Sequence, residues 1–322
     1  MMTINKTIKN KFAKIAEKIK NAKSIAIFAH TSYDPDGLGS MYGLAYFLEK
    51  QGKNVDKFVD SKICPTDAKF FDISQLCDEI TRDYDLMIMV DTANVERLGK
   101  YASAFAKHNN TIKLDHHVGY HTCAKIEVVL PLSSCCEVIL AYIESLGKKP
   151  DKITATYLFG GLLTDTDCFS TDTITAVSFQ NACKLIECGA DNVKATSMLV
   201  KSQSQAQYNL SKIVADKCEI HGDVYISSLT LKDYKKAGAQ LNEDGNISNK
   251  LIYLEGINIS CLIKQRQINV FSCSFRGRVG TDVSVIANKL GGGGHKLAAG
   301  AVIKGSEKSV KALVLKTIRE NR

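Results

Sequence analysis

Three apolar segments of this sequence each run directly into side chains that can bind a metal ion. The segments cover residues 24–29, 86–90 and 111–114, and the side chains that follow them are His30, Asp34, Asp36, Asp91, Asp115, His116 and His117. This donor set mixes carboxylates with imidazoles and contains no thiolate, which suits Mn²⁺, with Mg²⁺, Fe²⁺ and Co²⁺ as competitors. Two such ions bridged by a carboxylate can activate water toward a phosphate ester.

A fourth acidic element, Asp165 and Asp167, follows the apolar helix predicted over residues 151–163. Carboxylates beyond the C-terminus of a helix face the negative end of its dipole, which disfavours them. A bound cation would offset that cost, so Asp165 and Asp167 join the candidate site.

Each element also has an interpretation that needs no metal. Asp34 and Asp36 can instead belong to a turn that caps the next helix. Asp91 can cap the turn after its strand. Adjacent His116 and His117 beside Asp115 are harder to explain as structural groups, because burying them without partners costs free energy.

The elements that position these side chains alternate between strands and helices. Strands are predicted over residues 24–29, 54–59, 85–90 and 111–114, and helices over residues 39–50, 134–145 and 151–163. Apolar strands separated by helices predict a parallel sheet that is covered on both faces. Because ligands bind at the carboxyl ends of such strands, we expect the acidic and imidazole groups to meet at one edge of the sheet.

The second part of the chain has a different pattern of predicted secondary structure. A polar helical stretch follows residue 177, and short strands then predominate until a helix over residues 282–290, a glycine run, a strand and a terminal helix over residues 307–320. We therefore expect an α/β N-terminal domain over residues 1–185, a helical linker over residues 186–215 and a smaller α+β domain over residues 216–322.

Composition narrows the class of protein. The chain has 322 residues, a formal net charge of +8 and 11 cysteines, without a CxxC pair. The positive charge weakly favours an anionic partner. Unpaired cysteines and the absence of a signal-peptide pattern predict a cytoplasmic protein with reduced thiols, and no apolar run is long enough to cross a bilayer.

Taken together, these motifs resemble those of the DHH phosphoesterases. The resemblance rests on HTSYDPDGLGS at 30–40, Asp91, DHH at 115–117 and TDTDCF at 164–169, followed by SFRGRVG and GGGGHKLAAG, which resemble the DHH-associated C-terminal domain. It spans residues 24 to 300 with the motifs in the family's order. The size of the chain is similar to that of short bacterial members that degrade nano-RNA and dephosphorylate 3′-phosphoadenosine 5′-phosphate (pAp).

The resemblance implies a role for each matching residue. His30, Asp34 and Asp91 would hold one divalent ion, and the second ion, also bridged by Asp91, would be held by Asp36, His116 and Asp165. Asp115 would orient a ligand, and His117 would face the scissile phosphate. Substrate would be held in the smaller domain by Arg276, Gly292, Gly293, Gly294 and His295.

The resemblance therefore implies a metal-dependent hydrolase that cleaves short oligoribonucleotides or linear dinucleotides to mononucleotides and acts on pAp, with Mn²⁺ as the expected metal. The alternatives are an exonuclease acting on longer single strands, similar to RecJ, and a nucleotide-binding regulator without catalysis. No membrane and no obligate protein partner is expected, and a homodimer is left open. Two departures from the family pattern stand out: Asp167 replaces the usual glycine, and Tyr33 and Pro35 alter the first motif.

Overall fold

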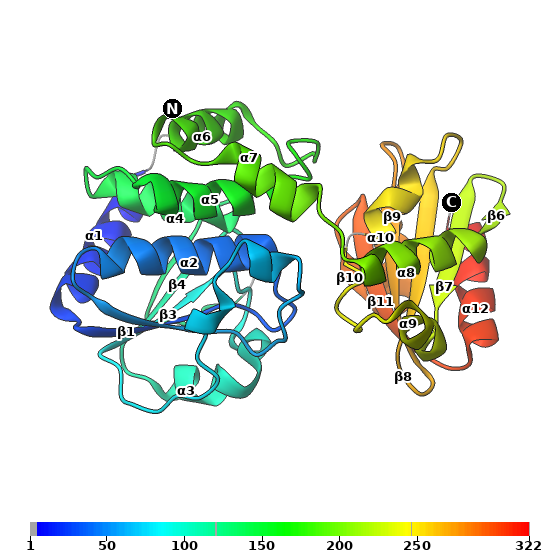
Figure 1. The fold of residues 1–322 in the computed structure, drawn as a ribbon, viewed down its shortest axis with the longest axis horizontal. Coiled ribbons are helices and arrows are strands. Elements are labelled where there is room, and N and C mark those ends of the chain that lie inside the picture. Colours follow the sequence, from blue (N-terminus) through cyan, green and yellow to red (C-terminus); the bar gives the residue numbers. More distant parts are fainter. Residues whose placement is uncertain (1–4, 120, 246, 322) are drawn as a thin grey trace. The chain divides into compact units, whose positions relative to one another are not determined.

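The computed structural model describes residues 5–119, 121–245 and 247–321 (Figure 1). It divides into two compact units, Met1–Ser202 and Gln203–Arg322. In the described part of the chain, no helix is both long enough and apolar enough to cross a membrane.

The first unit is built on a five-stranded parallel sheet with the strand order β2-β1-β3-β4-β5. The strands are β1 (Ser24–Phe28), β2 (Asn54–Phe58), β3 (Leu86–Val90), β4 (Thr111–Asp115) and β5 (Ile126–Val129). The four strands predicted from sequence are confirmed. The short β5, with the sequence IEVV, was not predicted.

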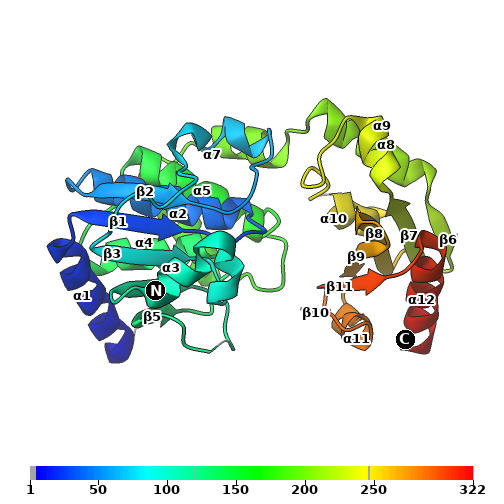
Figure 2. The ribbon, with the colours of Figure 1, turned by 90° about the horizontal axis from the view of Figure 1, so that it is seen from below.

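Helices cover both faces of this sheet, as predicted (Figures 1 and 2). One face carries α1 (Lys6–Asn21), α2 (Pro35–Glu49) and α4 (Cys135–Ser145), with α5 (Lys152–Asp165) against α2 and α4. The other face is covered by the 3₁₀ segment Val95–Tyr101 and by α3 (Ala102–Lys107). Strand β1 shows the alternation: Ile25 and Ile27 belong to the first core and Ala26 and Phe28 to the second.

Helix α2 begins earlier than the sequence indicated. We expected a loop to Gly39, whereas the helix starts at Pro35 with Asp34 as its N-cap. The Asp34 side chain accepts hydrogen bonds from the backbone N–H groups of Asp36 and Gly37, and proline is favourable in a first helical turn because it needs no N–H partner there. Asp36 therefore lies in the first turn of a helix and not in a loop.

Glycines bring α2 and α5 unusually close together. A Cβ atom on Gly39 would lie 2.7 Å from the carbonyl oxygen of Tyr157, and one on Gly43 would lie 2.7 Å from the Leu158 side chain. A Cβ on Gly161 would lie 2.3 Å from the sulfur of Cys136 and 2.9 Å from a carboxylate oxygen of Asp36. Only glycine allows these approaches without displacing a neighbour.

The polar stretch in which we expected a helical linker contains several helices. These are α6 (Ala176–Glu187), α7 (Asn192–Ala195), a π-helical turn over Thr196–Val200 and α8 (Gln205–Asp216). The division between the two units falls before α8, at Ser202 and Gln203.

The second unit contains a six-stranded mixed sheet with the strand order β10-β11-β9-β8-β7-β6. Its strands are β6 (Glu219–His221), β7 (Val224–Leu229), β8 (Ile259–Gln267), β9 (Val270–Gly277), β10 (Gly293–Gly294) and β11 (Ala298–Lys304). Within this sheet, β7 and β8 pair in parallel, and the other neighbouring strands pair antiparallel. The smaller α+β architecture predicted for this part of the chain is confirmed.

Helices lie on both sides of this second sheet. One core is closed by α11 (Val283–Lys289) and α12 (Glu307–Glu320). The other contains residues of α8, α9 (Leu231–Ala237) and α10 (Ile247–Lys250). Alternation along β8 separates the two cores, since Ile263 faces the first and Leu262 the second.

Candidate metal centre

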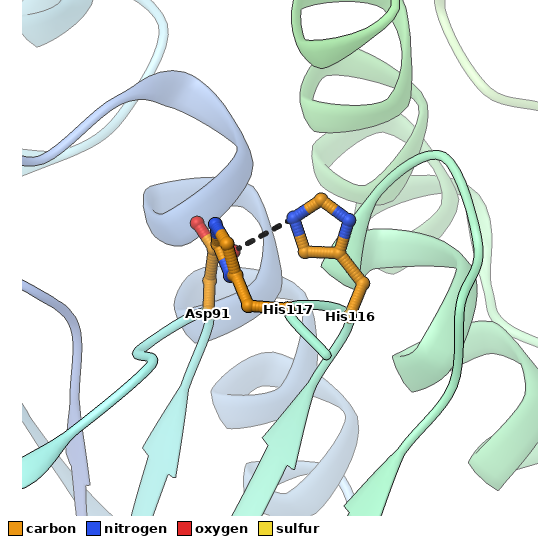
Figure 3. Close-up of side chains that lie close together, drawn as sticks. All are labelled: Asp91, His116 and His117. Atoms are coloured by element: carbon orange, nitrogen blue, oxygen red, sulfur yellow. Dashed lines mark ion pairs between the residues drawn. The ribbon is translucent and has the colours of Figure 1, made fainter. Parts of the chain in front are cut away.

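The carboxyl ends of β3 and β4 place three polar side chains next to one another (Figure 3). Asp91 directly follows β3, while His116 and His117 directly follow β4. Nε2 of His116 lies 3.4 Å from Oδ1 of Asp91, and Nδ1 of His117 lies 3.6 Å from the same oxygen. Asp91 has a left-handed backbone conformation with φ of 50°, which is rare for residues other than glycine, asparagine and aspartate.

A first group of candidate ligands consists of His30, Asp34 and Asp91. Nε2 of His30 lies 3.7 Å from Oδ2 of Asp34 and 3.5 Å from Oδ2 of Asp91. His30 and Asp91 are buried, whereas the Asp34 side chain is 48% exposed. This group therefore has one side open to solvent.

A second group consists of Asp36, His116 and Asp165. Nε2 of His116 lies 3.6 Å from Oδ2 of Asp165. Asp36 comes from the first turn of α2 and Asp165 from the last residue of α5. The structure thus brings together all six side chains that the sequence suggested as ligands.

The chemistry of the cluster fits a divalent cation. Asp91 is 2% exposed, and its Oδ1 has no hydrogen-bond partner among the described residues. A buried, unpaired carboxylate oxygen is costly unless a cation satisfies it. Burial and the neighbouring charge of Asp91 raise the pKa of Asp36 to about 7, and burial together with Asp36 raises that of Asp165. A bound cation would reduce the electrostatic repulsion among these carboxylates.

The imidazole and carboxylate groups also perturb one another strongly. Burial opposes a charge on His116, but the adjacent carboxylate of Asp91 and the nearby Asp36 and Asp165 outweigh burial and raise its pKa to about 11. Burial alone would raise the pKa of Asp91, but the interactions with His116 and His30 outweigh burial and lower it. A cation of higher charge would compete with these protons for the same lone pairs.

Asp36 is anchored by contacts that the sequence did not reveal. Its Oδ2 accepts a hydrogen bond from the backbone N–H of Cys135 at 2.6 Å, and its Oδ1 accepts one from that of Cys136 at 3.0 Å. These N–H groups belong to the first turn of α4, where helical donors lack intrahelical partners. Each carboxylate oxygen keeps a further lone pair that can bind a cation.

The two histidines of the DHH sequence are held by different partners. Nδ1 of His116 lies 3.1 Å from the backbone oxygen of Leu132, a contact that no sequence pattern signalled. Nδ1 of His117 lies 2.8 Å from Oδ1 of Asp115, and Lys113 pairs with the same carboxylate at 3.2 Å. Asp115 therefore contacts the ring of His117, and the ring of His116 contacts a carbonyl group.

Asp167, the departure from the family pattern, belongs to none of the candidate metal groups among the described residues. It is exposed and starts a run of left-handed residues, with φ of 44° at Asp167, 59° at Cys168 and 63° at Phe169. A glycine adopts this conformation at lower cost. The backbone conformation at this position thus favours glycine.

The candidate substrate residues of the second unit lie on β9, within β10 and next to β10. Arg276 on β9 pairs in register with Ala298 on β11, and its Nε donates a hydrogen bond to Oδ1 of Asn249 at 2.8 Å. His295 is exposed and lies in the turn between β10 and β11. A Cβ on Gly292 would lie 2.0 Å from the oxygen of Gly300, and one on Gly294 would lie 2.5 Å from the Cα of Ala299. Close strand approach therefore explains the glycines at 292 and 294, whereas Gly293 has no such crowding.

Comparisons with protein families match a different family model to each of the two units. Residues 24–162 match the model of the DHH family, N-terminal domain, and residues 222–321 match the model of the DHHA1 domain. The bifunctional oligoribonuclease and PAP phosphatase NrnA of Thermus thermophilus is 28% identical over 316 residues, which cover 95% of this chain and 93% of the relative. The protein of the same name from Bacillus subtilis is 26% identical over 289 residues, covering 87% of this chain and 89% of the relative.

A solved structure shares the whole fold. An exopolyphosphatase-related protein from Bacteroides fragilis superimposes with a TM-score of 0.89 at 19% sequence identity, covering 99% of this chain and 98% of the other. At that level of identity the likeness concerns the fold.

Proposed function

This chain belongs to the DHH family, and we propose that it is a two-metal phosphoesterase that hydrolyses short oligoribonucleotides or linear dinucleotides to mononucleotides and removes phosphate from pAp. The observation that carries the proposal is the pair of ligand groups that meet at Asp91 and His116. The names of the Thermus and Bacillus relatives, which pair an oligoribonuclease with a PAP phosphatase, support the substrate class.

In this proposal, residues of the first unit bind two cations. His30, Asp34 and Asp91 hold one cation, and Asp36, Asp91, His116 and Asp165 hold the other. When bound, the two divalent cations supply an activated water and neutralise charge on the phosphate. Mn²⁺ is the metal that we propose, because it accepts both imidazole and carboxylate ligands.

His117 and Asp115 act beside the metal ligands. Asp115 accepts from the ring of His117 and fixes its orientation. In its imidazolium form, His117 can also donate a hydrogen bond from its other ring nitrogen to a phosphate oxygen, so that charge developing on that oxygen is stabilised. Arg276, His295 and the Gly292–Gly294 backbone bind the distal part of the substrate.

The proposed function is tested by ranking substrates. The full chain loaded with Mn²⁺ is incubated with labelled di- to pentaribonucleotides, linear diadenylate, pAp, pyrophosphate and a long single strand, and initial rates are compared. We expect the short RNAs, diadenylate and pAp to be turned over, and exhaustive chelation to abolish the activity. Faster cleavage of the long strand would indicate an exonuclease, and activity that survives chelation would refute the two-metal assignment.

The substrate role of the second unit has a separate test. Arg276→Ala and His295→Ala should keep both metals and the melting temperature. Activity on dinucleotides should fall about tenfold to a hundredfold, the effect of losing one charge-assisted hydrogen bond. Activity on bis(p-nitrophenyl) phosphate, which is too small to use the distal contacts, should fall less. Equal losses on both substrates at an unchanged melting temperature would place these residues at the reacting phosphate.

A further inference from the structure

Arg97 is held next to the candidate metal centre by its backbone. It lies in the 3₁₀ segment that follows β3, and its carbonyl oxygen accepts a hydrogen bond from the N–H of Thr31 at 2.8 Å. Its own N–H donates to the side chain of Asn94, which caps the segment. Gly99, with φ of 60°, packs so closely that a Cβ there would lie 2.6 Å from Thr31. The backbone of Arg97 is therefore fixed against the residue that follows His30.

The side chain of Arg97 extends to the ring of His30. Its guanidinium nitrogen lies 3.2 Å from Nδ1 of His30, and the other nitrogen of that ring faces Asp34 and Asp91. One imidazole ring thus separates the guanidinium group from the first group of candidate ligands. The arginine is only partly buried, so part of its surface remains accessible.

This guanidinium group has no carboxylate counterion within residues 5–119, 121–245 and 247–321. Other arginines do: Arg82 pairs with Asp56 at 2.7 Å and Arg266 with Asp244 at 2.7 Å. The nearby Asp60 accepts instead from the backbone N–H of Lys100 at 2.8 Å. A guanidinium group carries five N–H donors, and His30 engages only one of its nitrogens.

An unpaired arginine beside a cluster of carboxylates is suited to an anion that must approach that cluster. The aspartates repel a phosphate group, and a fixed cation at their edge reduces this repulsion. Arginine also binds phosphate oxygens through two parallel N–H groups, which gives both energy and orientation. Lys100, the exposed lysine of the same segment, does not meet these requirements, because it pairs with Asp78 and lacks the planar guanidinium group.

The geometry points to Arg97 as a phosphate-binding residue of the first unit, one that contacts the phosphate group of the substrate at the metal centre. The inference rests on the proposed function, since it presumes that a phosphate meets the ligand cluster. It adds a residue outside the four motifs and outside the Arg276 and His295 pair. It also separates two tasks: Arg97 binds phosphate, whereas His30 binds metal.

The test measures equilibrium binding of inorganic phosphate to the Mn²⁺-loaded full chain by calorimetry, together with metal content. Arg97→Gln removes the charge but keeps a polar side chain whose amide oxygen can accept from Nδ1–H of a metal-bound His30, so metal content should stay unchanged while phosphate affinity falls about tenfold to a hundredfold. Arg97→Lys restores the charge without the planar fork and should recover part of the affinity. KM for diadenylate should rise in parallel with the loss of phosphate affinity.

Lys100→Ala is the matched control, because Lys100 is a cation of the same segment that pairs with Asp78. It should leave phosphate affinity unchanged. An equal loss for Lys100→Ala and Arg97→Gln would show a diffuse effect of charge and overturn the inference. Loss of metal from Arg97→Gln would show that Arg97 only positions His30, and would overturn it too. If no phosphoester were hydrolysed while phosphate binding still depended on Arg97, the proposed function would fail and the inference would stand.

Discussion

The two groups of candidate ligands are supported by the fold in different ways. In the first group, Asp34 is half-exposed and one of its oxygens already caps helix α2. In the second, Asp36 is buried, and both of its oxygens accept from the first turn of α4. The second group is therefore preorganised by the packing of helices, whereas the first depends on a cap at the surface. We expect the ion of the second group to be held more tightly.

The largest effect is expected where the two groups meet. Asp91→Ala should lose both metals and all metal-dependent activity, because His30 and His116 each face a different oxygen of this carboxylate. Elemental analysis of the purified protein measures the result. Asp91→Asn, which tolerates the left-handed backbone better than alanine, separates ligand loss from strain. Asp167→Ala is the control and should keep normal metal content; two metals per chain in Asp91→Ala would contradict the shared role.

Asp36→Asn should produce the next largest effect and sharpen the comparison. An amide oxygen can accept from one of the two backbone N–H groups, and the other would lose its partner. An unsatisfied buried donor costs about 1–3 kcal/mol, so the melting temperature should fall, and one metal per chain should be lost. Differential scanning calorimetry with metal analysis checks both. An unchanged melting temperature would mean that the amides of Cys135 and Cys136 do not stabilise the fold through Asp36.

Asp34→Asn should have the smallest effect on folding. Asparagine caps a helix about as well as aspartate, so stability should change by only a few tenths of a kcal/mol. The charge is lost, however, and the ion of the first group should be lost with it while the second is kept. Titration with a chelator should likewise remove the metals of the unsubstituted protein in two steps. Simultaneous release of both ions would contradict the expected difference in metal affinity between the two groups.

Sequence alone predicted the sheet and the placement of the candidate ligands at its edge. The reason is that apolar strands alternating with helices mark a parallel sheet, and three of the four predicted strands run directly into candidate ligands. It could not predict the amides that anchor Asp36, the carbonyl of Leu132 beside His116, or the approach of Arg97 to His30. Those partners are distant along the chain or are backbone groups, which leave no pattern in side-chain types. The predicted start of α2 is also too late, because Asp34, a candidate ligand, is at the same time the N-cap of this helix.

The glycine contacts between α2 and α5 have a consequence for motion. Asp36 and Asp165 lie on two helices whose backbones touch through Gly39, Gly43 and Gly161, so one helix cannot slide along the other without collision. The spacing between these two carboxylates is then set by close packing of main chains, and rotation of flexible side chains contributes little to it. Amide hydrogens along this contact should exchange with solvent only when the helices separate, whereas those of the loop bearing His30 and Asp34 can exchange through local opening. The spacing of Asp36 and Asp165 would thus change slowly, whereas the loop that carries His30 and Asp34 would open to solvent more often.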